Sequence, residues 1–295
     1  MMSKRPRRIL LLTFSSSRFI GSARLLCKRA IELDFTFVRI FSPLDLTSNF
    51  VQENAETLIH QRGAGYWIWK PWIILDTLKI LDGDEGFLYL DAGALPNLHV
   101  DSYLNFLTDG KIHLWSQKSA LEDNKYWVDP DVWEHIVGDR DVRGTHAWAG
   151  AILSPNTEEC RRIIEMWLNL CLNPKLLRPE TFQSYTRGSE LIAHRHDQSI
   201  LNCLIFKYPD LFRVHALNES IHNGEFISHR FKKVHTRLEV ILLLKLQAMY
   251  RHIMSFLPQK LESAIRHKVT QIRKPEILKE ELISLDKLHR RFPKS

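Results

Sequence analysis

The chain has few cysteines and no long hydrophobic run, which excludes several protein classes. Its four cysteines are widely separated and none lies in a Cys-x-x-Cys pair, so neither a disulfide framework nor a zinc knuckle is expected. No uninterrupted apolar run reaches the roughly 18 residues that a membrane-spanning helix needs. The run from Ile9 to Phe14 follows a basic start but is shorter than the core of a secretory signal, and it suits a buried strand. These absences favour a cytoplasmic protein.

Motifs for nucleic acids are also missing, and the positive charge gathers at one end. There is no Gly-Lys-Ser phosphate loop and no basic RNA-binding motif, so no nucleic-acid partner is expected. The net charge is +7, whereas the segment 230–295 alone holds 16 Lys and Arg against 6 Asp and Glu. We therefore predict a first domain over 1–237 and a helical, basic C-terminal extension over 238–295. Two interpretations of this extension stay open: a helix packed on the domain, or an amphipathic helix on the inner face of an anionic membrane.

What is present is the pattern of an α/β domain. The apolar fraction of 44% and the charged fraction of 25% are ordinary for a globular protein. The patterns at 9–14, 23–33 and 35–41 predict a strand, a helix and a strand in succession. Further helices are predicted at 71–81, 160–171 and 196–206, and a further strand at 87–90. This alternation predicts parallel strands with helices on both faces of the sheet.

The predicted strand at 87–90 ends in the sequence Asp91-Ala92-Gly93. In open α/β sheets the ligand crevice lies beyond the carboxyl ends of the strands. A carboxylate at that place can hold a divalent cation that bridges a diphosphate, or accept hydrogen bonds from a ribose. Gly93 would let the backbone approach the ligand closely. The alternative is that Asp91 only caps the turn.

The segment 63–72, GAGYWIWKPW, surrounds one lysine with three tryptophans and a tyrosine. Aromatic faces can stack on a base or a sugar, and Lys70 can contact a phosphate as a point charge. Arg62 precedes this segment and is either a second phosphate contact or a surface charge. The alternative for the aromatic residues is a helix start packed into the core.

A third group of polar residues opens the predicted helix at 196–206. His196, Asp197 and Gln198 precede apolar positions that anchor the helix, which suits the binding of a polyol. The alternative for Asp197 is a helix cap. The histidines farther along the chain are weak evidence for a metal site, since most histidines serve other purposes; they are His215, His222, His229 and His235.

Four segments together resemble a group of bacterial glycosyltransferases of the GT-A fold that build surface polysaccharides such as lipopolysaccharide. The segments are GYWIWKPWIIL, GFLYLDAGA, HAWAGAILS and RHDQSIL, and their order and spacing fit over about residues 7 to 235. The resemblance implies a Rossmann-type mixed sheet and a GT-A-like catalytic domain over 1–237. It also implies transfer of a sugar from a nucleotide-sugar donor to a saccharide or lipid-linked acceptor.

The resemblance further implies a role for individual residues. Asp91, Asp197 and Gln198 would be catalytic, with Asp91 at the position of the first acid of the Asp-x-Asp motif. The acceptor side would hold Trp69, Trp148 and His196. The donor would contact Phe14, Ser15, Ser17, Arg18, Arg62, Lys70 and Gly93.

The chain departs from the family at the second acid of Asp-x-Asp, which is replaced by Gly93. The resemblance implies a divalent cation, Mn²⁺ or Mg²⁺, held by Asp91 together with His229, or with His222 as its rival. Metal-independent transfer, with basic side chains neutralising the diphosphate, is the alternative. A non-catalytic carbohydrate- or nucleic-acid-binding protein is the alternative to an enzyme.

Overall fold

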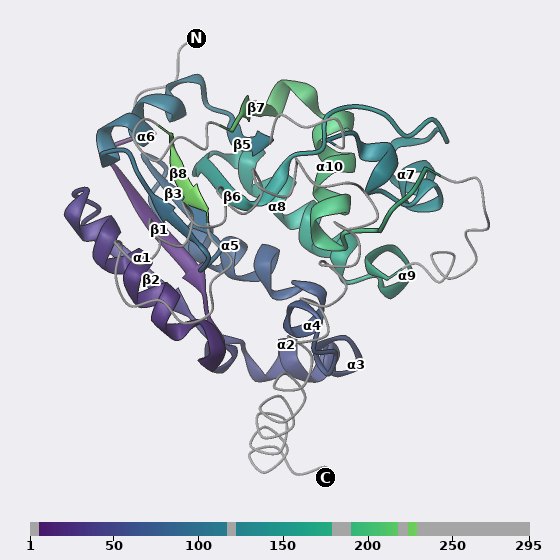
Figure 1. Cartoon of the computed structure of the whole chain (residues 1–295), viewed down its shortest axis with the longest axis horizontal. Coiled ribbons are helices and arrows are strands. Elements are labelled where there is room, and N and C mark those ends of the chain that lie inside the picture. Colours follow the sequence, from purple (N-terminus) through teal and green to yellow (C-terminus); the bar gives the residue numbers. More distant parts are fainter. Residues whose placement is uncertain (1–5, 117–121, 179–189, 218–223, 229–295) are drawn as a thin grey trace, which may run out of the picture. The chain divides into compact units, whose positions relative to one another are not determined.

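The structure is a computed structural model that describes residues 6–116, 122–178, 190–217 and 224–228. The strands in the described residues are β1 (Arg8–Phe14), β2 (Phe37–Phe41), β3 (Glu85–Leu90), β4 (Ala94–Pro96), β5 (Ile112–Ser116), β6 (Trp148–Pro155), β7 (Phe212–Ala216) and β8 (Phe226–Ser228). The helices there are α1 (Ile20–Glu32), α2 (Ser48–Glu53), α3 (Ala55–Leu58), α4 (Gly63–Tyr66), α5 (Trp69–Ile80), α6 (Val100–Phe106), α7 (Pro130–Val137), α8 (Glu158–Cys171), α9 (Pro174–Leu177) and α10 (Asp197–Lys207) (Figure 1).

Six strands form one mixed sheet in the order β2-β1-β3-β6-β5-β7. The strand β6 runs antiparallel to both of its neighbours, β3 and β5, and the other pairs are parallel. A small second sheet pairs β4 with β8. The predicted α/β class, a mixed sheet flanked by helices, is confirmed.

This topology brings the start of one strand to the same edge as the ends of the others. The parallel strands β1, β3 and β5 all finish at one edge, and the antiparallel strand β6 begins there. At this edge the backbone N–H of Asp91 donates to the carbonyl of Gly150 at 2.8 Å. We call this the carboxyl edge. It is the place where ligands of open α/β sheets bind.

Helices cover both faces of the sheet, so its central strand is fully buried. All six residues of β3 are buried. The helix α1 packs against β1, β2 and β4, while α5 packs on α8 and α8 on α10. One core cluster joins Leu12, Phe87 and Ile152 of the sheet to Ile73 of α5 and Trp167 of α8. Each such side chain contributes about 1.5–3 kcal/mol when it leaves water.

The predicted elements are present, with ends displaced by one to three residues. The helix predicted at 71–81 is α5, and that predicted at 196–206 is α10. The strand predicted to start at Phe35 starts instead at Phe37, because Asp34 adopts φ +64° and the N–H of Phe35 still donates to Ala30 of the preceding helix. The chain needs these residues to reverse direction, which composition does not reveal.

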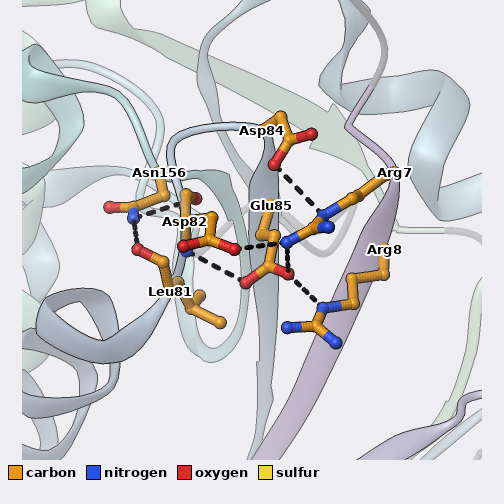
Figure 2. Close-up of polar contacts among 7 residues, drawn as sticks. All are labelled: Arg7, Arg8, Leu81, Asp82, Asp84, Glu85 and Asn156. Carbon is orange, nitrogen blue, oxygen red and sulfur yellow. Dashed lines mark hydrogen bonds and ion pairs between the residues drawn. The ribbon is translucent and has the colours of Figure 1, made fainter.

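At the opposite edge of the sheet, an ionic network fastens the start of β3 to the start of β1. Glu85 is fully buried and pairs with both Arg7, at 2.8 Å, and Arg8 (Figure 2). Arg7 also reaches Asp82 and Asp84 in the turn before β3. A buried carboxylate that lost these partners would be costly, so this network has a structural role.

The predicted C-terminal extension over 238–295 lies outside the described residues, and it stays a prediction. None of the helices in the ranges described above is long and apolar enough to cross a membrane.

Candidate functional site

Lys70 lies between two aspartates at the carboxyl edge. Its Nζ atom is 3.4 Å from Oδ1 of Asp91 and 3.3 Å from Oδ2 of Asp197, and it donates to the carbonyl of Ala149 at 3.1 Å. An ammonium group has three N–H donors. The Lys70 ammonium group thus donates to one carbonyl and lies within ion-pair distance of two carboxylates, whereas a phosphate contact was predicted for it. Its position instead suits the holding of two carboxylates.

The two carboxylates also keep Lys70 charged although its side chain is only 4% exposed. Burial by itself lowers the pKa of an ammonium group, but the charges and hydrogen bonds of Asp197 and Asp91 outweigh it and raise the pKa of Lys70 above its ordinary value. The cluster Lys70–Asp91–Asp197 thus contains one cation and two acids.

Asp91 is the open acid of the cluster. Its side chain is 36% exposed, and its Oδ1 atom accepts a hydrogen bond of 2.6 Å from the hydroxyl of Tyr89. Burial and the charge of Asp91 raise the pKa of the Tyr89 phenol well above its ordinary value, so the phenol stays a donor. The Asp91 side chain therefore contacts Lys70 and Tyr89, and this is a different role from capping a turn.

Tyr89 was missed by the sequence analysis. Residues two apart on a strand point to the same face, so a tyrosine two positions before a strand-end acid was the available signal. The same spacing occurs in many strands that have no functional site. Only the position of Asp91 beside Lys70 indicates that Tyr89 belongs to one.

Asp197 is the buried acid. It is the first residue of α10, and its side chain is 3% exposed. Its carbonyl accepts a hydrogen bond of 2.9 Å from the indole of Trp167. Oδ2 lies within ion-pair distance of Lys70 but accepts no aligned hydrogen bond from the described residues. Burial raises the pKa of Asp197 to about 6, the charge of Lys70 opposes this, and that of Asp91 adds to it.

Asp197 should make the protein less stable as the pH rises from about 4 to about 6. The ordinary pKa is 3.8, so the folded protein keeps this proton after the unfolded chain has lost it. The contribution is fully present below about pH 4 and is lost as the pH passes about 6, with a size of about 3 kcal/mol. Urea unfolding of the wild type and Asp197→Asn from pH 4 to 7.5 measures it. A difference between the two proteins that does not change with pH would contradict the prediction.

The chain reaches Lys70 through a left-handed turn over 63–67. Five consecutive residues have positive φ, from +49° at Ala64 to +93° at Gly65. Non-glycine residues pay about 1–2 kcal/mol each for this conformation, and Ala64, Tyr66 and Trp67 all adopt it. Backbone strain of this kind gathers at functional sites. The sequence analysis missed the turn, although two glycines in GAGYW were a signal for it.

The left-handed turn fixes the entry to α5. The indole N–H of Trp69 donates to the carbonyl of Gly63 at 2.9 Å, and its ring stacks on Phe14 with centroids 3.7 Å apart. Both rings are buried. Trp69 and Phe14 thus occupy core positions beside the site, which agrees with the alternative of aromatic residues packed into the core. Little of either ring can reach an acceptor or a donor.

Substituting Gly65 by alanine should destabilise the protein by about 2–4 kcal/mol. A Cβ atom there would lie 2.8 Å from Cα of Leu58, at a φ of +93°. Gly138 is the matched control, because its φ is +104° but a Cβ would meet nothing within 4 Å. Gly138→Ala should therefore cost only about 1 kcal/mol. Urea unfolding measures both, and equal costs would contradict the close packing of the left-handed turn.

Trp148 is a predicted acceptor-side residue that is half-buried and lies at the carboxyl edge. It begins β6, and its indole lies directly over Gly150, whose place leaves no room for a Cβ atom. Gly150 also accepts the backbone hydrogen bond from Asp91. The small residues of HAWAGA therefore let the Trp148 ring and the Asp91 backbone approach the same strand.

His196 is buried on aromatic rings beside the cluster. Its centroid is 4.4 Å from that of Tyr66, and its Nδ1 donates to the carbonyl of Leu177 at 2.8 Å. It has a strained φ of +55°. Burial and the charges of Arg62 and Arg178 lower the pKa of His196 to about 4 despite the hydrogen bond to Leu177. Arg62 itself is exposed.

The remaining predicted donor contacts are spread around the ends of β1 and β3. Ser15 is buried and its hydroxyl donates to the carbonyl of Ser16 at 2.9 Å, while Ser17 is exposed and Arg18 is half-buried. Gly93 lies in the turn whose closing hydrogen bond runs from Ala94 to Asp91 at 2.8 Å. Gln198, which was predicted to be catalytic, is half-buried and contacts His146. The roles of these residues stay predictions.

The described residues contain no group of three or more His, Cys, Asp or Glu side chains placed to bind a metal ion. A cation on Oδ1 of Asp91 would also lie beside the Lys70 ammonium group, which is 3.4 Å from that oxygen. His222 and His229, the predicted partners, lie outside the described residues.

Comparisons with known proteins give distant likenesses only. No family model and no curated protein match the chain. It is similar to a glycosyltransferase involved in the glycosylation of the major capsid of PBCV-1, with 13% identity, coverage of 79% of this chain and 98% of that one, and a TM-score of 0.41. It is also similar to apo mouse xyloside xylosyltransferase 1, with 12% identity, coverage of 71% and 85%, and a TM-score of 0.40. The galactosyltransferase LgtC, solved with donor and acceptor sugar analogs, has 13% identity, coverage of 72% and 74%, and a TM-score of 0.37.

Proposed function

We propose that the protein is a glycosyltransferase that moves a sugar from a nucleotide-sugar donor to a hydroxyl of a saccharide or lipid-linked acceptor. The observation that carries this proposal is the Lys70–Asp91–Asp197 cluster, which has one open and one buried acid at the carboxyl edge of an α/β sheet. Clustered groups with perturbed pKa values are typical of functional sites. The position matches the ligand crevice of such sheets.

The two acids would act on the sugar. In glycosyl transfer the ring carbon gains positive charge as its bond to the diphosphate breaks. When both are ionised, Asp91 and Asp197 carry two negative charges against the single positive charge of Lys70. The cluster is then net anionic. Such a site stabilises the developing cation, provided that the carboxylates are held in place beforehand. Lys70 and Tyr89 supply that restraint.

The leaving diphosphate gains negative charge and needs cationic neighbours. Lys70 is enclosed, so this role falls to arginines near the carboxyl edge. Of these, Arg62 is exposed and Arg18 is half-buried. We propose Arg62 as the first diphosphate contact. A soluble divalent cation that accompanies the donor is the alternative, and it is tested by adding Mn²⁺, Mg²⁺ or EDTA.

The test is a panel of UDP-, GDP-, dTDP- and CMP-sugars with the full chain, read by thermal shift and by nucleotide release. Binding raises the melting temperature according to affinity. We expect one donor to bind and to release its nucleotide slowly to water, and faster with a saccharide acceptor. If no nucleotide sugar binds, the proposal fails. Binding without release to any acceptor would favour a non-catalytic carbohydrate-binding protein.

We further propose that the acceptor belongs to cell-surface polysaccharide synthesis and that the basic segment 238–295 binds the inner face of a membrane. The excess of Lys and Arg in this part of the chain supports the second point. Flotation of the full chain with anionic vesicles, compared with zwitterionic ones, tests it. Equal flotation with both would contradict an electrostatic contact.

A further inference from the structure

Behind Gln198 a chain of hydrogen bonds leads to the backbone. Nε2 of Gln198 is 2.8 Å from Nε2 of His146, and Nδ1 of His146 is 2.8 Å from Oδ1 of Asn124. The amide nitrogen of Asn124 donates to the carbonyl of Arg143 at 3.0 Å. Asn124 and His146 are both buried. The direction of every hydrogen bond in this chain follows from its last member.

The carbonyl of Arg143 can only accept a hydrogen bond, so the NH₂ group of Asn124 must face it. The other end of that amide, Oδ1, then faces His146 and can also only accept. Nδ1 of His146 must therefore carry its hydrogen. A neutral imidazole has one N–H, which leaves Nε2 of His146 as an acceptor.

His146 is neutral at ordinary pH. Burial is the main cause, and together with the charge of Arg195 it lowers the pKa of His146 to about 3. Its Nε2 must then receive a hydrogen, and the NH₂ group of Gln198 supplies it. The Gln198 amide therefore has one orientation, in which its Oε1 atom turns away from His146.

Oε1 of Gln198 is open. It makes no hydrogen bond with the described residues. It is also not one of the fully buried side-chain atoms that lack a partner, so it is accessible. Gln198 lies in the first turn of α10, next to Asp197 of the Lys70–Asp91–Asp197 cluster. This atom, on the residue next to Asp197, is thus a hydrogen-bond acceptor that is free for a ligand.

The contact between His146 and Gln198 is rigidly supported. Asn202, one turn further along α10, binds the backbone of Ala147 with both ends of its amide, at 2.7 Å and 3.0 Å. The same Asn202 amide donates to the carbonyl of Gln198 at 2.8 Å. The segment 146–147 and the first turn of α10 therefore move as one unit.

We propose that His146 is a positioning residue, which holds the Gln198 amide so that Oε1 accepts a hydrogen bond from a hydroxyl group of the donor sugar. That the ligand is a donor sugar rests on the proposed function. A phosphate oxygen is not the partner of Oε1, since it brings no hydrogen at neutral pH and would repel a carbonyl oxygen. Gln198 thus binds a hydroxyl group of the sugar and not the diphosphate.

The first measurement needs no ligand. Nitrogen-15 NMR of the histidine side chains distinguishes a protonated ring nitrogen from a bare one, and His146→Gln identifies the signals that belong to His146. We expect Nδ1 of His146 to be protonated and Nε2 to be bare from about pH 5 to pH 8. The opposite tautomer, or a charged ring in this range, would overturn the proposal.

The second measurement uses UDP-glucose and GDP-glucose, with derivatives in which each ring hydroxyl in turn is replaced by fluorine. Fluorine accepts but cannot donate, so one derivative should lose about 10-fold or more in kcat/KM with the wild type. In His146→Leu the amide is free to turn its NH₂ group toward fluorine, and this selectivity should shrink to about 2-fold. His146→Gln can place a carbonyl against Gln198 and should restore it.

Selectivity that stays unchanged in His146→Leu would overturn the positioning role, whatever the effect on stability. If His146→Leu does not fold, Gln198→Met in the wild-type background removes the acceptor, and it should abolish the same selectivity. If neither glucose donor binds and no other nucleotide sugar of the panel binds either, the proposed function and the hydrogen bond from Oε1 to a sugar hydroxyl are both contradicted. The NMR measurement then still decides whether His146 orients the Gln198 amide.

Discussion

Replacing Lys70 by methionine is expected to lower the free energy of unfolding by about 3–5 kcal/mol at pH 7.5. The substitution keeps the length of the side chain but removes the cation that pairs with Asp197, whose carboxylate is 3% exposed. An ionised carboxylate left in that place has neither water nor a counterion. Urea unfolding measures the loss, which should shrink below about pH 5 because protonated Asp197 needs no counterion.

Two controls separate this effect from a general cost of substitution. Lys79→Met, on the exposed end of the same helix, should change stability by less than about 0.5 kcal/mol. The double substitution of Lys70→Met with Asp197→Asn should recover part of the loss, since it removes the buried charge. If Lys70→Met costs no more than Lys79→Met, Lys70 does not hold the two acids.

Replacing Asp91 by asparagine is expected to lower kcat/KM by about 100- to 1,000-fold while changing stability by less than about 1 kcal/mol. The amide has nearly the same shape, so binding and folding should survive. The charge that would face the developing cation is lost. Nucleotide release from the best donor in the panel measures the activity, and urea unfolding measures the stability.

Asp210 supplies the matched control for Asp91. It is exposed and lies just before β7, at the edge of the sheet away from the site. Asp210→Asn should leave kcat/KM within about 2-fold of the wild type. Tyr89→Phe removes one hydrogen bond to Asp91 and should fall between the two, at about 10-fold. An Asp91→Asn variant with full activity would remove Asp91 from the chemistry.

The order of strands and helices was readable from the sequence because buried strands and amphipathic helices have different periods. The apolar run ending at Phe14 is β1, and the run ending at Leu90 is β3. The antiparallel insertion of β6 between β3 and β5 was not readable, since pairing partners far apart in the chain leave no local pattern.

The site was readable in part. The sequence analysis named Lys70, Asp91 and Asp197 separately, and the structure places one carboxylate oxygen of each aspartate within 3.4 Å of the Lys70 ammonium group. Their roles could not be predicted, because a role depends on burial and on neighbours. Lys70 was expected to contact a phosphate, whereas its ammonium group lies beside the carboxylates of Asp91 and Asp197 and donates to the carbonyl of Ala149.

By itself the sequence determined that an acid follows a buried strand at a glycine-containing turn, and that a lysine and a second acid stand at helix starts. Tertiary structure alone decided which acid is open, since β6 and Tyr89 enclose one side of Asp91 while α10 and α8 enclose Asp197. It also decided that Gln198 faces His146, and hence which end of its amide is free. The physical reason is that charge state and hydrogen-bond direction follow from burial and from the partners within reach, and folding brings those partners from distant parts of the chain.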